Sequence, residues 1–172
     1  GNVLDMFARS VGLHPPSGRS VEDAARKGSA LVDLPYTVKG NDVLYSGLLT
    51  AAIKKHDEGA KVEDLSFSLQ EMAFSMLAEA AERSLAHTGK KDLLLTGGVA
   101  ANRRLQEMLK IVAEEHKSRF LVVDAKYSGD CGAQIAWTGL LAFKSGETVE
   151  IERSHVKPRW RLDEVDISWR GD

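Results

Sequence analysis

The sequence contains a single cysteine, Cys131, among 172 residues. One thiol excludes an intramolecular disulfide framework and any zinc site built from several cysteines. The sequence also lacks an apolar run approaching the roughly 20 residues that a membrane-spanning helix needs. Its opening residues, Gly-Asn-Val-Leu-Asp-Met-Phe-Ala-Arg, lack the charged-then-apolar pattern of a secretion signal. We therefore expect a cytoplasmic protein with no membrane partner.

Histidines are few, and their spacing excludes a common class of metal site. The five histidines stand at positions 14, 56, 87, 116 and 155, so no two are three or four residues apart. No helical turn can therefore chelate a metal through a histidine pair, and the His-Glu-x-x-His motif of metalloproteases is absent. A metal held by this chain alone would be poorly ligated. The Gly-x-Ser-x-Gly elbow of serine hydrolases is missing too. Cys131 has no histidine nearby in the sequence that could act as its base, so we interpret it as a small buried residue.

Positive and negative charges nearly balance, with a net charge of −2. This argues against a protein that coats nucleic acid nonspecifically, because such proteins carry a strongly basic field. A local basic patch remains at Lys157-Pro158-Arg159-Trp160-Arg161. Its cations flank an aromatic ring that can stack on a base. The alternative is a solvated tail whose Trp160 packs onto the domain.

The first half of the chain is predicted to be mainly helical. Val3, Leu4, Phe7 and Val11 share one helical face, which ends at Gly12 and leaves Asp5 away from it. Ser20 and Asp23 resemble a capping box, which predicts a short helix that starts at Ser20 and ends near Gly28. Irregular or short extended segments are predicted over 30–44, with a turn at 40–42. A helix over about 45–58 follows, and then the longest helix, which starts at about 62 and carries an apolar stripe over 67–85. This stripe would bury against a sheet or a partner helix, and its methionines are interpreted as core.

The second half alternates between strands and helices. The predicted order is a strand over 92–96, a helix over about 99–116, a strand over 119–123, a helix over about 131–144, and a tail from about 148 with extended character and mixed charge. This β-α-β-α order indicates an α/β fold, in which ligands bind outside the carboxyl ends of strands. The loops over 96–98 and 127–132 lie at such ends.

Two glycines end the first of these strands. Gly97 and Gly98 permit positive φ and let a flat or anionic group lie against the backbone, and the following helix would point free N–H groups there. This pattern is typical of a nucleotide site. It is also compatible with simple turn chemistry.

Asp130 stands directly before the last predicted helix, between Gly129 and Cys131, with Gly132 after them. One interpretation is an N-cap aspartate that satisfies a free helix N–H. The other is a metal ligand, because the small neighbours leave room for a cation and the phosphates that it would bridge.

Several motifs occur in order along nearly the whole chain. They are Gly-Asn-Val-Leu-Asp-Met-Phe-Ala-Arg at 1–9, Tyr-Ser-Gly-Leu-Leu-Thr-Ala at 45–51, Ser-Leu-Gln-Glu-Met-Ala-Phe at 68–74, Gly-Gly-Val-Ala-Ala-Asn at 97–102, Gly-Asp-Cys-Gly-Ala at 129–133, Ile-Ala-Trp-Thr-Gly at 135–139 and Arg-Leu-Asp-Glu-Val at 161–165. Taken together, the chain resembles the carboxyl-terminal half of the tRNA threonylcarbamoyladenosine transferase catalytic subunit of the KEOPS complex, formerly called O-sialoglycoprotein endopeptidase. The Arg-x-Asp-Glu-Val and Trp-Arg ending is similar to the archaeal and eukaryotic branch.

The resemblance implies an actin-like (ASKHA) ATPase fold, in which a nucleotide lies between two lobes. Residues 1–172 would be the second lobe, with a large helical portion over 1–91 and a β-α-β-α core and tail over 92–172. The first lobe, which carries a His-x-x-x-His metal-binding pair in this family, is absent from the chain.

The resemblance also assigns roles to single residues. Asp5 and Glu22 would contact ATP or threonylcarbamoyl-adenylate, Gly18 would make room for it, and Asn102, just past Gly97 and Gly98, would touch it too. Asp130 would be the third protein ligand of the catalytic metal, which can be iron, zinc or magnesium. Each role has an alternative: Asp5 as a polar-face residue, Glu22 as a first-turn acid that stabilises the helix dipole, and Asn102 as a solvent-facing residue.

The resemblance implies transfer of a threonylcarbamoyl group from threonylcarbamoyl-adenylate to adenosine 37 of tRNA. The expected partners are tRNA, a small protein kinase and other KEOPS subunits, and the isolated half should be inactive. The family usually has asparagine where Cys131 stands, and glycine and proline where Ser17 and Arg19 stand. The alternatives are one lobe of a small-molecule kinase with the same fold, or a noncatalytic scaffold that binds a protein kinase through the 67–85 stripe.

Overall fold

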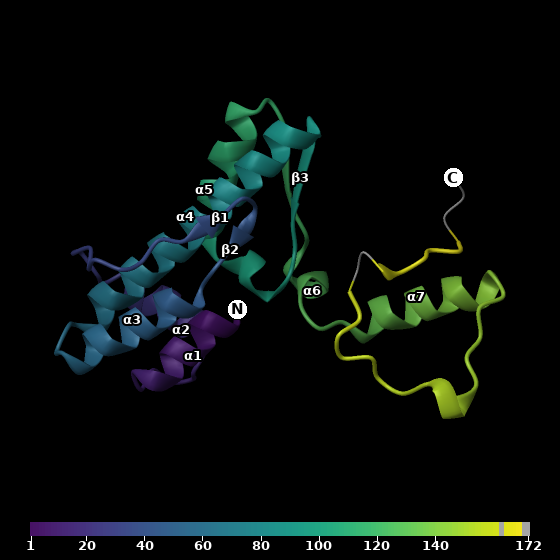
Figure 1. The fold of residues 1–172 in the computed structure, drawn as a ribbon, viewed down its shortest axis with the longest axis horizontal. Coiled ribbons are helices and arrows are strands. Elements are labelled where there is room, and N and C mark those ends of the chain that lie inside the picture. Colours follow the sequence, from purple (N-terminus) through teal and green to yellow (C-terminus); the bar gives the residue numbers. More distant parts are fainter. Residues whose placement is uncertain (162–163, 170–172) are drawn as a thin grey trace. The chain divides into compact units, whose positions relative to one another are not determined.

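The computed structural model of the chain describes residues 1–161 and 164–169. The chain forms two compact units, Gly1–Gly129 and Asp130–Asp172 (Figure 1). Among the described residues, no helix is both long enough and apolar enough to cross a membrane.

The first unit contains most of the regular structure. Its elements are α1 (Asn2–Ser10), α2 (Gly18–Ala25), β1 (Val38–Lys39), β2 (Asp42–Val43), α3 (Ser46–Asp57), α4 (Val62–Thr88), β3 (Asp92–Leu95), the 3₁₀ turn η1 (Gly98–Ala101), α5 (Arg103–Glu115), β4 (Arg119–Val122) and α6 (Ala125–Ser128). The predicted order of helices and strands is confirmed except at η1, which interrupts a predicted helix, and at α6, which was not predicted. The turn predicted at 40–42 joins β1 to β2 as an antiparallel hairpin, with Gly40 at a φ of +62°.

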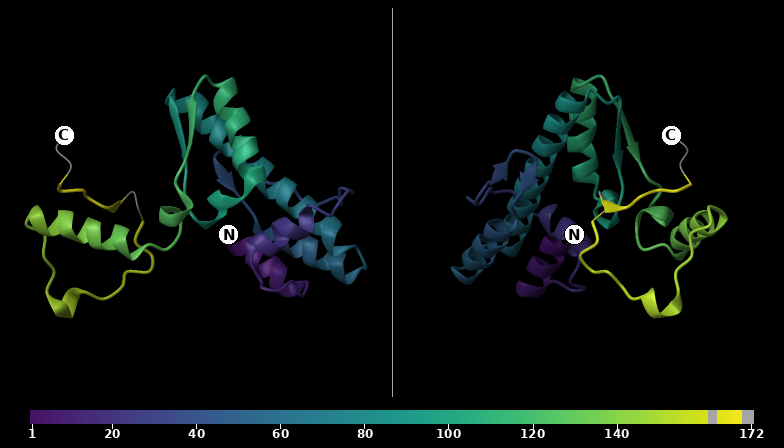
Figure 2. Two further views of the ribbon diagram at one scale, coloured as in Figure 1. Left: turned by 180° about the vertical axis from the view of Figure 1, so that it is seen from behind. Right: turned by 45° about the vertical axis from the view of Figure 1, so that its right-hand side comes forward.

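Helix α4 is the long element on which the first unit is built (Figures 1 and 2). Helices α2, α3 and α5 all pack against it. Its fully buried side chains include Leu65, Leu69 and Met76, which confirms the stripe as a core face and Met76 as a core residue. The helix ends where Gly89 adopts the left-handed conformation, at a φ of 62°, as glycine does most readily.

Helix α2 begins earlier than the sequence predicts. Its N-cap is Ser17, whose hydroxyl accepts the Ser20 N–H at 3.3 Å. Ser20 does not cap the helix, because its own hydroxyl donates to the carbonyl of Pro15. The capping-box prediction was therefore wrong by one turn. As a result Glu22 lies beyond the first turn, and the prediction that it is a first-turn acid is wrong as well.

Strands β3 and β4 are parallel, with Leu93 opposite Phe120 and Leu94 opposite Leu121. Leu93 and Phe120 pack against the core, whereas Leu94, on the other face, is 60% exposed. The bidentate ion pair from Arg119 to Asp92, at 2.6 and 2.9 Å, joins the first residues of the two strands and lowers the pKa of Asp92. The β-α-β order predicted from the sequence is therefore confirmed.

The helix predicted over 99–116 is broken. The segment Gly98–Ala101 is a 3₁₀ turn, Asn102 is extended with ψ at 120°, and α5 begins only at Arg103. The apolar pattern carries through the break, which is why the sequence suggested one helix. The break is set by the Asn102 side chain, which caps α5.

The second unit contains α7 (Gly132–Lys144) and the 3₁₀ turn η2 (Ile151–Arg153). The N-cap of α7 is Cys131, so the interpretation of Asp130 as an N-cap is wrong. Cys131 is half-buried rather than buried. The described part of the tail contains η2 and turns but no strand, and Glu150 is extended there. Leu162, Asp163 and the arginine of the Trp-Arg ending lie outside the described residues.

Gly28 sets the close approach of α2 to α4. A β-carbon at this position would meet the backbone carbonyl of Glu63 and lie 2.8 Å from the β-carbon of Phe67. We expect Gly28→Ala to lower the free energy of unfolding by about 1–3 kcal/mol, because a backbone has to move to admit the methyl group. Urea denaturation monitored by circular dichroism measures this loss.

The matched control is Gly47→Ala. Gly47 lies in the first turn of α3, and an added β-carbon there would meet nothing within 4 Å. This change should leave stability unchanged or raise it slightly, because alanine favours helix more than glycine does. Equal effects of the two substitutions would contradict the close approach at Gly28.

Candidate functional site

A cavity of about 590 Å³ lies where α1, the start of α2 and the turn after β3 meet. Its lining residues are Gly1, Leu4, Asp5, Ser17, Gly18, Arg19, Thr96, Gly97, Gly98, Val99, Ala101 and Asn102. Asp5, Gly18, Gly97, Gly98 and Asn102 were all predicted from the sequence to contact a ligand. The fold brings these five residues to one cavity although they are spread over about a hundred positions of sequence.

The glycine turn presents bare backbone to this cavity. Gly97 has a φ of +98°, a conformation that residues with a side chain rarely adopt. A β-carbon added at Gly97 or at Gly98 would meet nothing within 4 Å, so the space beside the backbone is open. The turn leads directly into η1, and the first N–H groups of a helical turn have no partner inside that turn. A phosphate or a flat ring can therefore approach the backbone here.

Asp5 connects α1 to the start of α2. Its carboxylate accepts the backbone N–H of Gly18 at 2.7 Å, and a negative charge at a helix N-terminus is favourable. A β-carbon at Gly18 would lie 3.4 Å from Leu4. Asp5 is thus more than a polar-face residue, because it holds the Gly18 backbone at the cavity wall.

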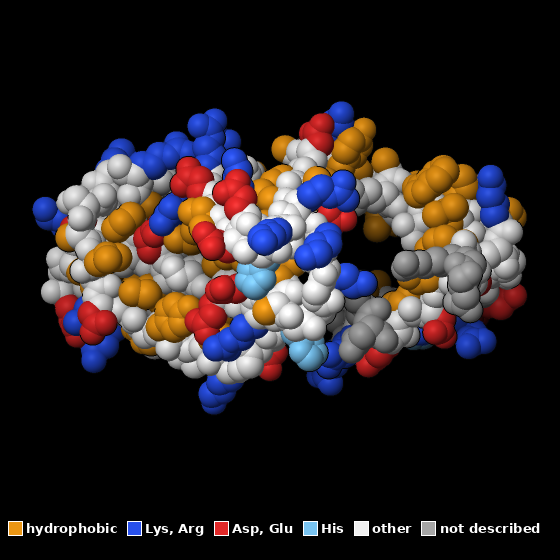
Figure 3. Space-filling view, turned by 90° about the horizontal axis from the view of Figure 1, so that it is seen from above, with side chains coloured by type: hydrophobic (Ala, Val, Ile, Leu, Met, Phe, Trp, Pro, Cys, Tyr) orange, Lys and Arg blue, Asp and Glu red, His pale blue; other side chains and the backbone are white. Residues whose placement is uncertain are grey.

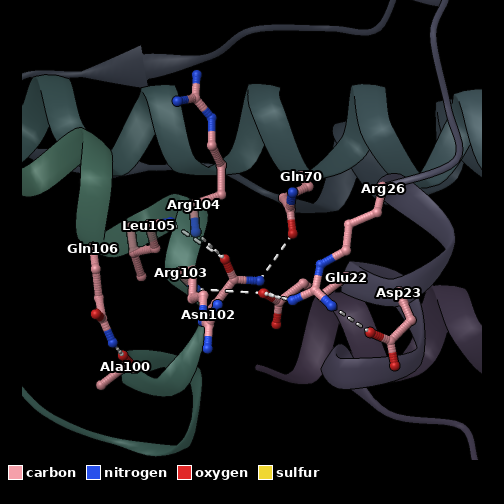
Figure 4. Close-up of polar contacts among 10 residues, drawn as sticks. All are labelled: Glu22, Asp23, Arg26, Gln70, Ala100, Asn102, Arg103, Arg104, Leu105 and Gln106. Atoms are coloured by element: carbon pink, nitrogen blue, oxygen red, sulfur yellow. Dashed lines mark hydrogen bonds and ion pairs between the residues drawn. The ribbon is translucent and has the colours of Figure 1, made fainter.

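Asn102 is buried, with only 6% of its surface exposed, so the prediction of a solvent-facing side chain is wrong. Its Oδ1 accepts the N–H groups of Arg104 and Leu105 at 3.0 and 3.2 Å. Its Nδ2 donates to Oε1 of Gln70 at 2.8 Å, as Figure 4 shows. The side chain therefore caps α5 and ties it to α4, and Asn102 is one of the residues that line the cavity.

Glu22 does not line the glycine cavity. It lies in a neighbouring hollow of about 360 Å³, together with Arg26, Gln70 and Arg104. Its carboxylate pairs with Arg26 at 2.9 Å and accepts the backbone N–H of Arg103 at 3.4 Å (Figure 4). Glu22 thus touches the chain next to Asn102 from outside the cavity.

Sequence reasoning did not assign the polar residues of α4 that support this corner. Gln70 is buried and bonded to Asn102. Glu71 binds Arg104 through two hydrogen bonds of 2.7 and 2.8 Å, which raise the pKa of the Arg104 guanidinium. The sequence did offer one signal for Gln70, which is a glutamine inside the apolar stripe of α4. A buried amide needs a hydrogen-bond partner, so such a residue indicates a polar contact inside the core.

The short helix α6 was also missed. Its N-cap is Asp124, which accepts the Lys126 N–H at 3.2 Å. The buried hydroxyl of Ser128 donates to the carbonyl of Gly97 at 2.8 Å. The chain therefore returns to the glycine turn just before the first unit ends.

Asp130 is the first residue of the second unit and is exposed. Within residues 1–161 and 164–169, no three histidine, cysteine or acidic side chains gather into a group that could hold a metal ion. The donor set of the described chain therefore does not fit a complete metal site. The role of Asp130 as a metal ligand stays a prediction.

Comparison with known proteins identifies relatives over the whole chain. A family model described as TsaD, tRNA N6-adenosine threonylcarbamoyltransferase, matches residues 1–137. A tRNA N6-adenosine threonylcarbamoyltransferase of Thermofilum pendens is 54% identical over 99% of this chain and 51% of its own length, and one of Caldivirga maquilingensis is 50% identical over 98% and 51%. A probable bifunctional tRNA threonylcarbamoyladenosine biosynthesis protein of Methanocaldococcus jannaschii is 52% identical over 98% of this chain and 32% of its own.

Among solved structures, the crystal structure of HypF from T. kodakarensis has a TM-score of 0.61 and 27% identity, covering 80% of this chain and 19% of that protein. The chain spans about half the length of the curated transferases that it matches. The family model covers well over half of the chain, and the resemblance predicted from ordered motifs is confirmed. This chain belongs to the tRNA N6-adenosine threonylcarbamoyltransferase family.

Proposed function

We propose that this chain forms half of the active site of a tRNA threonylcarbamoyltransferase. The exocyclic amine of adenosine 37 would form a bond to the carbonyl carbon of threonylcarbamoyl-adenylate, the bond from that carbon to the AMP oxygen would break, and AMP would leave. The observation that carries the proposal is the shared cavity: five residues predicted to contact the nucleotide line it together. Family membership supports the choice of reaction.

Residues of this chain would bind and orient the adenylate, or ATP. The bare backbone at Gly97 and Gly98 admits its phosphate or its flat ring, and backbone N–H groups there can donate to phosphate oxygens. Asp5 holds the Gly18 backbone at the wall of the same cavity. Asn102 is fixed by α5 and Gln70, so its position does not have to be organised when the ligand arrives.

We also propose that the complete protein has the actin-like ATPase fold and that residues 1–172 form its second lobe. The parallel β-α-β unit, with its cavity at the carboxyl end of β3, supports this fold, as does the structural similarity to HypF. In this arrangement residues 1–91 form the mainly helical part, and residues 92–172 form the core and tail.

Asp130 would contribute a carboxylate to a divalent metal, either iron, zinc or magnesium. The part of the chain that the structure describes forms no complete metal site, so the remaining ligands would be the His-x-x-x-His pair of the first lobe. Further proposed partners are a small protein kinase and other KEOPS subunits, in the cytoplasm. The bifunctional name of the M. jannaschii relative, in which this chain aligns to about a third of the length, is compatible with a fused partner.

The test combines this chain with a first lobe from a family member and supplies threonylcarbamoyl-adenylate and unmodified tRNA. We expect threonylcarbamoylated adenosine in the digested tRNA, with release of AMP, and no product from the chain alone. Release of ADP would indicate a kinase instead. Kinase binding by the combined lobes, with no transfer to tRNA, would indicate a scaffold. Product from the isolated chain would overturn the two-lobe assignment.

A further inference from the structure

The tail contains a run of positive charge that the proposed active site does not use. Residues 153–161 include four lysines and arginines, one histidine and no acidic residue. The rest of the chain is different: the whole chain has a net charge of −2, so without the four cations of this run the remainder has a net charge of −6, and Figure 3 shows positive and negative side chains interspersed on one face. Within the described part of the second unit, Arg153, Lys157 and Arg159 are exposed and form no ion pair with a carboxylate.

A turn inside this run displays an aromatic ring. The N–H of Trp160 donates to the carbonyl of Lys157 at 3.1 Å, which closes a four-residue turn that we call the Trp160 turn, residues 157–160. Pro158 occupies its second position, where the fixed φ of proline is favourable. The geometry of the turn is therefore held by a hydrogen bond and a proline ring.

Within this turn the Nζ of Lys157 lies 4.8 Å from the centre of the Trp160 ring. Trp160 is nevertheless 56% exposed, so the expectation that it packs onto the domain is wrong. An ammonium group covers only one face of an indole, and the exposed fraction leaves ring surface for a second planar group. A large aromatic displayed among cations is the combination that binds single-stranded nucleic acid, because bases stack on the ring and phosphates contact the cations.

We propose that the Trp160 turn binds a single-stranded stretch of the RNA substrate. A base stacks on Trp160, while Lys157 and Arg159 contact the neighbouring phosphates. An acidic protein surface would match the cations but would gain little from the exposed indole face, which is why RNA is the partner that this surface fits. The inference rests on the proposed function, since that function supplies a tRNA substrate.

The experiment uses this chain combined with a family first lobe and measures the binding of labelled unmodified tRNA at several salt concentrations. We expect Trp160→Ala to weaken binding about tenfold, and Trp160→Phe to retain most of the affinity, because phenylalanine keeps a stacking face. The double change Lys157→Gln, Arg159→Gln should reduce the slope of log affinity against log salt by about 1.4, as expected when two single-strand phosphates lose their cations. The rate of transfer at saturating tRNA should stay unchanged.

The matched control is Lys54→Gln with Lys55→Gln. These two exposed lysines of α3 carry the same charge outside the basic run, and their removal should leave the salt slope unchanged. If the wild-type lobes modify tRNA but the tail variants bind it as tightly as wild type, the inference fails and the proposed function stands. An acidic protein partner would give that same result. If the wild-type lobes neither bind nor modify tRNA, both fail.

Discussion

Replacing Asp130 with alanine is expected to lower threonylcarbamoyl transfer by at least about a hundredfold in the two-lobe enzyme, because outer-shell partners of a metal alone change activity 10–100-fold and a ligand should matter more. Stability should change by less than about 0.5 kcal/mol, since the side chain is exposed and does not cap α7. The two measurements are the initial rate of tRNA modification and the urea midpoint.

Glu147→Ala provides a matched control for Asp130→Ala. It removes another exposed carboxylate from the same unit, in the loop after α7. It should leave both transfer and stability at wild-type levels. Full activity of Asp130→Ala would remove Asp130 from the proposed site, even if the combined lobes modify tRNA.

Asn102→Ala is expected to give the largest loss of stability, about 2–4 kcal/mol. The change removes the cap of α5, worth about 0.5–2 kcal/mol, and leaves the buried carbonyl of Gln70 without its donor, which costs about 1–3 kcal/mol. Chemical denaturation of the chain measures the loss. A change smaller than 0.5 kcal/mol would contradict the network that joins α4 to α5.

A double-mutant cycle separates these two contributions. Gln70→Leu leaves the α5 cap in place but removes the acceptor of the Asn102 amide. We expect this change to destabilise the chain by about 1–3 kcal/mol. Combined with Asn102→Ala, it should cost less than the sum of the single changes, because the two side chains share one bond. Strict additivity would show that the two residues act independently.

The sequence predicts the elements whose periodicity is long and uninterrupted. Helix α4 is a clear example, because its apolar positions recur over many turns and its core face follows from that spacing. Strands β3 and β4 are short, but each is an apolar run bounded by polar residues. In these cases the hydrophobic pattern decides the structure.

Predictions fail where one side-chain hydrogen bond decides the structure. The predicted helix over 99–116 is interrupted because Asn102 caps α5, and nothing in the apolar spacing marks that choice. Helix α2 begins at Gly18 because the Ser20 hydroxyl bonds to Pro15 and Ser17 caps instead. Helix-capping propensity allows several residues to serve as the N-cap, and the tertiary contacts decide which of them does.

The candidate site was predicted in part for a similar reason. Ordered motifs and strand ends indicated Asp5, Gly18 and the glycine turn, and these residues share one cavity. Gln70 and Ser128 were not assigned, because their importance comes from partners at distant positions. Such pairings depend on how the chain folds back on itself and cannot be derived from local spacing.

The exposed face of the β3–β4 ribbon has a consequence that we expect for the chain when it is produced alone. Parallel strands are normally covered on both faces, yet Leu94 and Leu121, side by side in register, are 60% and 43% exposed. We expect an exposed apolar face of this kind to associate with other copies of the chain at high concentration. We therefore expect the chain to stay in solution better when it is co-expressed with the proposed first lobe.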